Sequence, residues 1–233
     1  MIMKKVLFFA IMMMAVATAK AQFAPGTFSI QPKIGFTVSW LSNAPKLPYA
    51  YEGKYSLDKT AAGGIIIGAD AEYMVNDIFA VEAGINYSMQ GSQWEDETWH
   101  EGDWRYDIND TKIELGYVNI PVTAKVYVWR GLAVKAGVQM GLLTNAKFKS
   151  KLHERMEGTS TVTTTTVSEK IRSDCEKMDL SIPIGVSYEF SNHIVVDARY
   201  NWGLTKINKE KDFGDKNMKN SVFLITCGYK FKL

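Results

Sequence analysis

Apolar and polar positions alternate along most of this chain. Between residues 118 and 128 the even positions are mostly apolar, and after a short break at residues 129–131 the alternation resumes as far as residue 142. Alternation with period two over two runs joined by a tight turn predicts a β-hairpin. Each run has roughly the 9–11 residues that a tilted strand needs to cross a bilayer.

The same hairpin pattern occurs a second time, between residues 181 and 205. Ile120-Pro121 of the first copy matches Ile182-Pro183 of the second, and Gly141-Leu142 matches Gly203-Leu204. Two copies with the same apolar parity indicate a sheet that is built by repeating one hairpin.

Further alternating runs bring the number of predicted strands to eight. They cover residues 31–41, 64–75, 78–90 and 221–233, beside the two hairpins. The connections are short at residues 76–77, 129–131 and 191–193, and long and polar at 42–63, 91–111, 144–177 and 205–220. This arrangement is typical of outer-membrane barrels, in which closure of the sheet removes every edge. We therefore predict an all-β fold, an eight-stranded antiparallel up-and-down transmembrane β-barrel with short periplasmic turns and long extracellular loops.

Alternation alone does not say which face lies outside, because a secreted lipocalin is also an eight-stranded barrel and has its apolar face inward. Aromatic residues near both ends of the apolar face favour the membrane, where such girdles are expected. They are Trp40, Tyr87, Trp202 and Phe223 at the loop end, and Tyr73, Phe79, Tyr188, Phe190 and Phe231 at the turn end.

The opposite face mixes glycines with charged residues of both signs. Ten of these charges are predicted to meet in the lumen as neutralised pairs: Lys33, Asp70, Glu72, Glu82, Lys125, Lys135, Glu189, Asp197, Arg199 and Lys230. Since an eight-stranded barrel is only wide enough for side chains to fill it, we expect a filled lumen rather than an open pore.

The N-terminus has the features of a secretory signal peptide. Lys4 and Lys5 precede an apolar run over residues 6–16, and Ala19-Lys20-Ala21 forms an A-x-A cleavage site. We therefore expect a signal peptide over residues 1–21, a barrel domain over 22–233 and a location in the bacterial outer membrane. An uncleaved anchor is the less favoured alternative, because the run is shorter than the 18 residues of a spanning helix.

Composition excludes several classes of function. Without the three lysines of the signal peptide, 24 basic residues stand against 25 acidic ones, which argues against nucleic-acid binding. Two cysteines, Cys175 and Cys227, make neither a disulfide scaffold nor a metal framework. We expect no cofactor, no metal and a monomer.

Two strand motifs and the C-terminus resemble a known family. The motifs are Tyr117-Val118-Asn119-Ile120-Pro121-Val122 with Lys125, and Ser181-Ile182-Pro183-Ile184-Gly185, and the chain ends Gly228-Tyr229-Lys230-Phe231-Lys232-Leu233. Over essentially the whole mature chain it is similar to the small PorT-like outer-membrane β-barrel family. The resemblance implies an eight-stranded barrel, usually of undefined function, and one member of that family is linked to export of secreted proteases. Because a closed barrel has no edge to host a proline, we expect a bulge at Pro121.

The long loops hold two groups of candidate binding residues. Trp94, Trp99 and Trp104 lie among acidic residues and could stack on sugars or beside a divalent cation, although a loop that packs its own aromatics is favoured. Lys147, Lys149 and Lys151 share one face and could meet lipopolysaccharide phosphates. By parity they continue the lumen face, and a solvated face is favoured.

The histidines leave an enzyme as an alternative. His153 with Glu154 and nearby serines could mimic the catalytic group of a lipid-modifying barrel, but the spacing gives no nucleophile signature. We expect a non-enzymatic barrel that is structural or binds through its loops, with lipid-modifying activity or assistance to protein secretion as alternatives. The expected partners are outer-membrane lipid and lipopolysaccharide, with an envelope protein or glycan at the loops.

Overall fold

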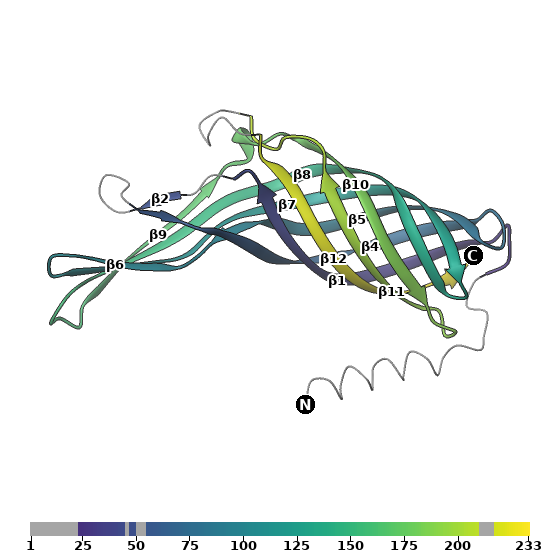
Figure 1. Cartoon of the computed structure of the whole chain (residues 1–233), viewed down its shortest axis with the longest axis horizontal. Helices are drawn as coiled ribbons and strands as arrows, with labels where there is room; N and C mark the ends of the chain where they lie inside the picture. The colour runs from purple at the N-terminus through teal and green to yellow at the C-terminus, as the bar shows by residue number, and fades with distance from the viewer. Residues whose placement is uncertain (1–22, 45–46, 50–54, 210–216) are drawn as a thin grey trace.

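Eight long strands form a closed antiparallel ring in the computed structural model, which describes residues 23–44, 47–49, 55–209 and 217–233 (Figure 1). The predicted signal peptide, residues 1–21, and its cleavage site therefore lie outside the described residues. In ring order the strands are β1 (Phe28–Ser42), β4 (Lys59–Met74), β5 (Phe79–Trp94), β7 (Trp104–Trp129), β8 (Leu132–Met156), β10 (Met178–Glu189), β11 (Ile194–Gly203) and β12 (Lys219–Tyr229). Pairing of β12 with β1 closes the ring.

Shorter elements lie beside the strands of the ring or in the connections between them. β13 (Phe231–Lys232) pairs with the start of β1, and β2 (Leu47–Tyr49) pairs with β3 (Tyr55–Leu57) in the first long connection. One turn of 3₁₀ helix, η2 (Arg172–Asp174), precedes β10. Among the described residues, no helix has the length and apolar character required to span a membrane.

The short turns all lie at one end of the ring and are built from local contacts. The Asn76 side chain accepts hydrogen bonds from the backbone N–H groups of Ile78 and Phe79. Arg130 and His193 adopt left-handed backbone conformations, with φ of 45° and 62°. Tight turns at this end hold neighbouring strands in register, as the sequence predicted.

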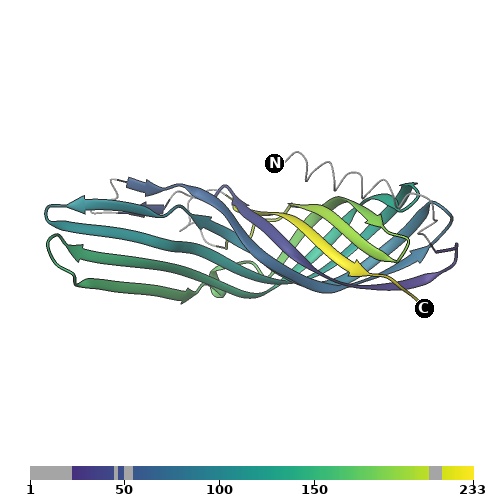
Figure 2. The same ribbon diagram turned by 90° about the horizontal axis from the view of Figure 1, so that it is seen from below.

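At the other end, β7 and β8 continue far beyond the ring. They contain 26 and 25 residues and are flanked by β6 (Glu97–Glu101) and β9 (Val162–Lys170). The four strands make a flat sheet in the order β6-β7-β8-β9, which we call the distal sheet (Figure 2). Its part of β7, residues 104–111, extends about 25 Å at the usual rise of a strand. Much of the predicted long loops at 91–111 and 144–177 is therefore strand.

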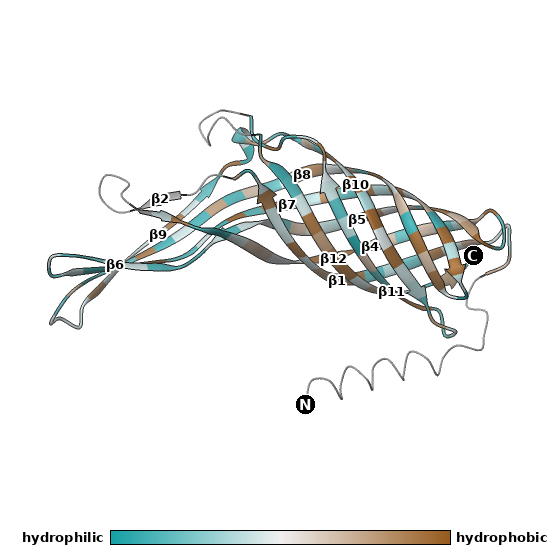
Figure 3. Cartoon of the chain, in the orientation of Figure 1, coloured by the Kyte–Doolittle hydropathy of each residue, from teal (hydrophilic) through white to brown (hydrophobic). Residues whose placement is uncertain are grey.

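The apolar face of the ring points outward. Ile34, Phe36 and Val138 are 61%, 73% and 64% exposed, and apolar and polar residues alternate along the strands of the barrel (Figure 3). Charged and amide side chains lie inside. A surface of this kind is stable only in contact with lipid, so the arrangement is that of a membrane barrel and not of a lipocalin.

The prolines are accommodated without bulges, so the bulge expected at Pro121 is wrong. The register between β5 and β7 is the same before and after Pro121, and pairing is only interrupted where Pro121 lies opposite Gly84. Pro183 interrupts the pairing of β10 with β8 in the same way, opposite Gly137. The missing N–H of each proline therefore interrupts the hydrogen bonds to one neighbouring strand. Pairing with the strand on the other side continues.

Candidate functional site: the lumen and the distal sheet

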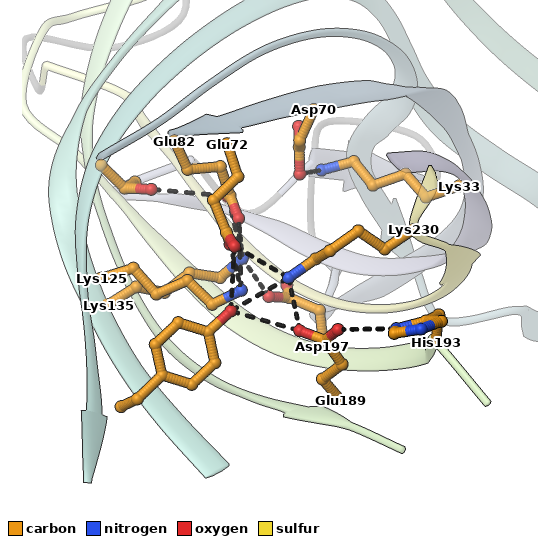
Figure 4. A network of polar contacts seen from close by, with 12 residues as sticks. Lys33, Asp70, Glu72, Glu82, Lys125, Lys135, Glu189, His193, Asp197 and Lys230 are labelled. Carbon is orange, nitrogen blue, oxygen red and sulfur yellow. Dashed lines mark hydrogen bonds and ion pairs between the residues drawn. The ribbon is translucent and has the colours of Figure 1, made fainter. Parts of the chain in front are cut away.

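All ten predicted lumen charges lie inside the barrel, and none is more than 5% exposed. Each takes part in at least one ion pair. The lysines and carboxylates approach one another from different strands and meet near the barrel axis (Figure 4). Burial of charge is tolerated when the charges are paired and hydrogen-bonded in this way.

Glu82, on β5, is the centre of one part of this network. Its carboxylate lies 3.0 Å from Lys135 Nζ, 3.2 Å from an Arg199 guanidinium nitrogen and 3.9 Å from Lys125 Nζ. Lys135 and Arg199 also contact Asp197, on β11. One carboxylate therefore links cations from three other strands.

Lys230 is the centre of a second part, nearer the turn end. Its Nζ lies 2.9 Å from Glu72 and 2.5 Å from Glu189. The Tyr127 hydroxyl, 3.0 Å from Glu72, completes this cluster, and His193 Nδ1 lies 3.3 Å from Glu189. Tyr127 was not among the predicted lumen residues, although its odd position on β7 places it on the lumen face.

Other side chains line the barrel above and below the charges. Toward the loop end lies a layer of amides, in which Asn119 donates to Asn86 and Ser88. Beyond it an apolar cluster closes the barrel mouth, formed by residues that include Leu41, Trp94, Ile113, Leu115, Tyr117 and Leu143. At the turn end Met74, Ala80, Tyr127 and Ala133 form a smaller cluster with Phe23 packed against it.

The three tryptophans named as loop candidates do not converge. Trp94 is 3% exposed within the apolar cluster at the barrel mouth, whereas Trp104 is 43% exposed at the far end of the distal sheet. Trp99 stacks on Tyr106, with ring centroids 5.1 Å apart. These contacts match a segment that packs its own aromatics. The described residues contain no group of three or more His, Cys, Asp or Glu side chains that could hold a metal ion.

Lys147, Lys149 and Lys151 lie on the outward face of β8, so the expectation that they continue the lumen face is wrong. Tyr117 pairs with Leu143 but Gly116 pairs with Asn145, which leaves Thr144 as an extra residue in β8. A bulge of one residue exchanges the two faces of a strand. Leu143 is therefore buried toward the lumen, and beyond the bulge Ala146 takes that side.

Two carboxylates on β7 form ion pairs with two of these three lysines. Glu114 lies 2.8 Å from Lys149 Nζ and 3.2 Å from Lys112 Nζ, and Asp110 lies 2.6 Å from Lys151 Nζ. Burial alone would raise the pKa of the Glu114 carboxyl, but the hydrogen bonds from Lys149 and Lys112 hold that pKa below its ordinary value. The hydrogen bond from Lys151 lowers the pKa of Asp110. Both carboxylates are therefore ionised at neutral pH.

The histidines and cysteines are dispersed. His153 Nδ1 lies 2.9 Å from Thr164 Oγ1 on the exposed distal sheet, and His100 lies 3.6 Å from Glu157. Glu154, which follows His153 in β8, projects from the other face of that strand. Cys175, buried at the loop end, and Cys227, exposed on the outward face of β12, are free thiols.

Comparison with known proteins places this geometry in a family. The family model described as "Outer membrane protein beta-barrel domain" matches residues 20–209. No curated protein matches the chain.

Three solved structures illustrate the likeness, each at low identity. Ail of Yersinia pestis is 15% identical with a TM-score of 0.39, over 89% of this chain and 99% of Ail. Neisserial surface protein A is 15% identical with a TM-score of 0.44, over 90% and 100% of the two chains. The N-terminal barrel of Pseudomonas aeruginosa OprF is 12% identical with a TM-score of 0.32, over 90% and 100%. The family model covers most of the sequence, and the chain therefore belongs to the outer membrane protein beta-barrel domain family, whose place is the bacterial outer membrane.

Proposed function

We propose that this chain is a non-enzymatic outer-membrane barrel with a closed lumen, which acts by binding at its extracellular surface. The observation that carries the proposal is the contact between Glu82 and Arg199. Their strands, β5 and β11, are four strands apart in either direction around the ring. A side-chain contact between opposite walls leaves no continuous channel along the axis.

The energetics of the network favour a closed resting state. Opening a path for ions would separate Lys135 and Arg199 from Glu82 and Asp197 within the barrel. Leaving a buried charge without its partner costs about 3–5 kcal/mol, and several pairs would have to break together. The apolar cluster at the barrel mouth adds a second barrier to water.

Binding is then assigned to the part of the molecule outside the bilayer. The distal sheet has two faces and two edges, and β9 is exposed along its whole length. Its two central strands, β7 and β8, are continuous with the barrel wall, so a partner would meet a preformed surface, which reduces the ordering cost of binding.

Planar-bilayer recordings on the refolded protein test the closed lumen. We expect no stable single-channel steps, while an open porin reconstituted in the same way gives steps of nanosiemens size. Reproducible steps of that size from the wild-type protein would contradict the proposal. A variant with Glu82, Lys135, Asp197 and Arg199 all replaced by Ala serves as the matched control, because it keeps the backbone and removes the central side chains.

Two finer assignments belong to the same proposal. The Ile-Pro motifs support placing the chain among PorT-like barrels, since Pro121 and Pro183 occupy equivalent positions opposite glycines. We also propose cleavage after Ala21, so that the mature protein begins at Gln22. N-terminal sequencing of the protein purified from outer membrane tests the cleavage site, and a start at Met1 would contradict it.

A further inference from the structure

The outward face of β8 changes from apolar to basic where the strand leaves the bilayer. Val138 and Leu142 are 64% and 38% exposed on the lipid-facing side of the barrel. After the bulge at Thr144, the same side of the strand carries Lys147, Lys149 and Lys151. Lys147 lies five residues beyond Leu142, about 15 Å along a tilted strand, which is the level of lipid headgroups.

Neighbouring strands bring further lysines to this level in like-charged rows. Lys112 on β7 is the direct partner of Lys149, and Lys170 on β9 is the direct partner of Lys147. Like charges placed directly opposite each other in a sheet are destabilising. On β7 the direct partner of Lys147 is Glu114, so the row nearer the membrane consists of one carboxylate and two lysines.

The carboxylates of this surface neutralise only part of its charge. Glu114 contacts both lysines of the Lys112–Lys149 row, and Asp110 contacts Lys151. Within the parts of the chain that the structure describes, Lys147 and Lys170 make no ion pair. Five lysines therefore share two carboxylates, and this surface carries an excess of positive charge.

The basic character is confined to the outward face. On the inward face the same levels of β7 and β8 carry Ile113, Ala146 and Phe148, which pack in or against the cluster at the barrel mouth. The positive charge is thus directed at the lipid that surrounds the barrel.

We propose that Lys147 and Lys170, assisted by Lys112 and Lys149, bind the phosphate groups of outer-leaflet lipid, such as those of lipopolysaccharide. The inference rests on the proposed function in that it names the partner of the extracellular surface. Lipid is the occupant that fits, because beyond the bulge the lysines lie on the same side of β8 as the lipid-facing residues and at headgroup level. A soluble anion, unlike lipid, is not confined to headgroup level and could equally bind at the far end of the sheet.

A pair of matched double variants tests the site. Lys147→Gln/Lys170→Gln removes the row near the membrane, and Arg105→Gln/Arg155→Gln removes another cross-strand row of like charge at the far end of the same sheet. Lipopolysaccharide is titrated into each refolded protein in neutral-detergent micelles, and heat-modifiable gel mobility verifies that each variant is folded. At about a factor of five for each lysine near an anionic surface, we expect affinity to fall about 25-fold in the first variant and less than threefold in the second.

Two further ligands separate lipid phosphate from other anions. Dephosphorylated lipopolysaccharide should bind the wild-type protein as weakly as intact lipopolysaccharide binds the first variant, and soluble pyrophosphate should bind weakly to all three proteins. Equal affinity of both double variants for lipopolysaccharide would overturn the proposal, as would undiminished binding of the dephosphorylated lipid or tight binding of pyrophosphate. The conductance of the lumen is measured separately, so failure of the lipid site is distinguishable from failure of the closed barrel.

Discussion

Arg199 and Glu82 stand on opposite walls of the barrel, yet the Arg199 guanidinium lies 3.2 Å from Glu82 Oε1. The glycines on the lumen face make the approach possible. A Cβ on Gly84, for example, would lie only 2.1 Å from Asp70 Oδ1. Small residues therefore provide the space in which long charged side chains cross the barrel and meet.

Replacing either partner of this contact should destabilise the folded barrel. Glu82→Ala leaves Lys135 and Arg199 with one fewer carboxylate, and Arg199→Ala leaves Glu82 and Asp197 with one fewer cation. We expect each to lower the free energy of unfolding by about 3–5 kcal/mol, measured by urea titration in lipid vesicles. Glu169→Ala, on exposed β9, is the control and should change it by less than about 0.5 kcal/mol. Neutral behaviour of both lumen variants would mean that water fills the lumen.

Labelling of intact cells tests which end of the barrel faces the outside. A short epitope inserted at Thr163, in the distal sheet, should be reached by antibody on intact cells, because this end carries the long connections. The same epitope at Asn76, in a two-residue turn, should be reached only after the outer membrane is permeabilised. The opposite pattern would invert the assignment of the two ends.

Removal of the Glu114 charge should strengthen binding of anionic lipid at the lysine rows. It holds Lys112 and Lys149, so Glu114→Gln both frees two lysines and removes a negative charge. We expect a several-fold gain in lipopolysaccharide affinity in the titration described above. Asp77→Asn, in the two-residue turn at the other end of the barrel, is the control of equal charge change.

The pH dependence of this gain follows from the lowered pKa of Glu114. A carboxyl with a depressed pKa stays ionised as the pH falls through the ordinary glutamate value of about 4.3 and takes up its proton only below it. The affinity ratio of variant to wild type should therefore be constant from neutral pH to about 5, and should approach one in more acidic solution. A ratio that has already moved halfway to one at about pH 4.3, the ordinary glutamate pKa, would show that the Glu114 pKa is not lowered.

Cys175 should resist thiol reagents in the folded protein. Burial raises the pKa of its thiol to about 11, so the reactive thiolate is scarce at neutral pH. In a Cys227→Ser background, we expect a charged maleimide to label the protein slowly when folded and fully after unfolding in urea. Rapid labelling of the folded form would show that the loop end is open to solvent.

Period-two alternation was sufficient to predict the eight strands, their order and the inward position of all ten lumen charges, because both faces of a membrane strand are constrained along its length. The reversal of Lys147, Lys149 and Lys151 could not be predicted in this way. Outside the bilayer neither face must be apolar, so no pattern marks the extra residue at Thr144. Trp94 was misread for a related reason, since it lies beyond the spanning segment but is covered by the cluster at the barrel mouth.

The interruption of strand pairing at Pro121 could not be predicted from the sequence either. A proline in a closed sheet can be accommodated by a bulge or by omission of hydrogen bonds, and the choice depends on the neighbouring strand. Here Gly84 is that neighbour. Only the pairing of β5 with β7 reveals it, because the two residues are distant in sequence.

The bulge at Thr144 acts on the side-chain pattern of β8 as a frameshift acts on a reading frame. Everything before it is read with odd positions inward, and everything after it with even positions inward. If Thr144 were instead paired regularly, with the sequence unchanged, the rest of the strand would turn over and present Phe148 to the surrounding lipid headgroups and the lysines to the barrel mouth, whereas deletion of Thr144 would restore regular alternation and keep the lysines outside. The chemistry of the molecule's outer surface is thus set by whether one residue is left out of the ladder.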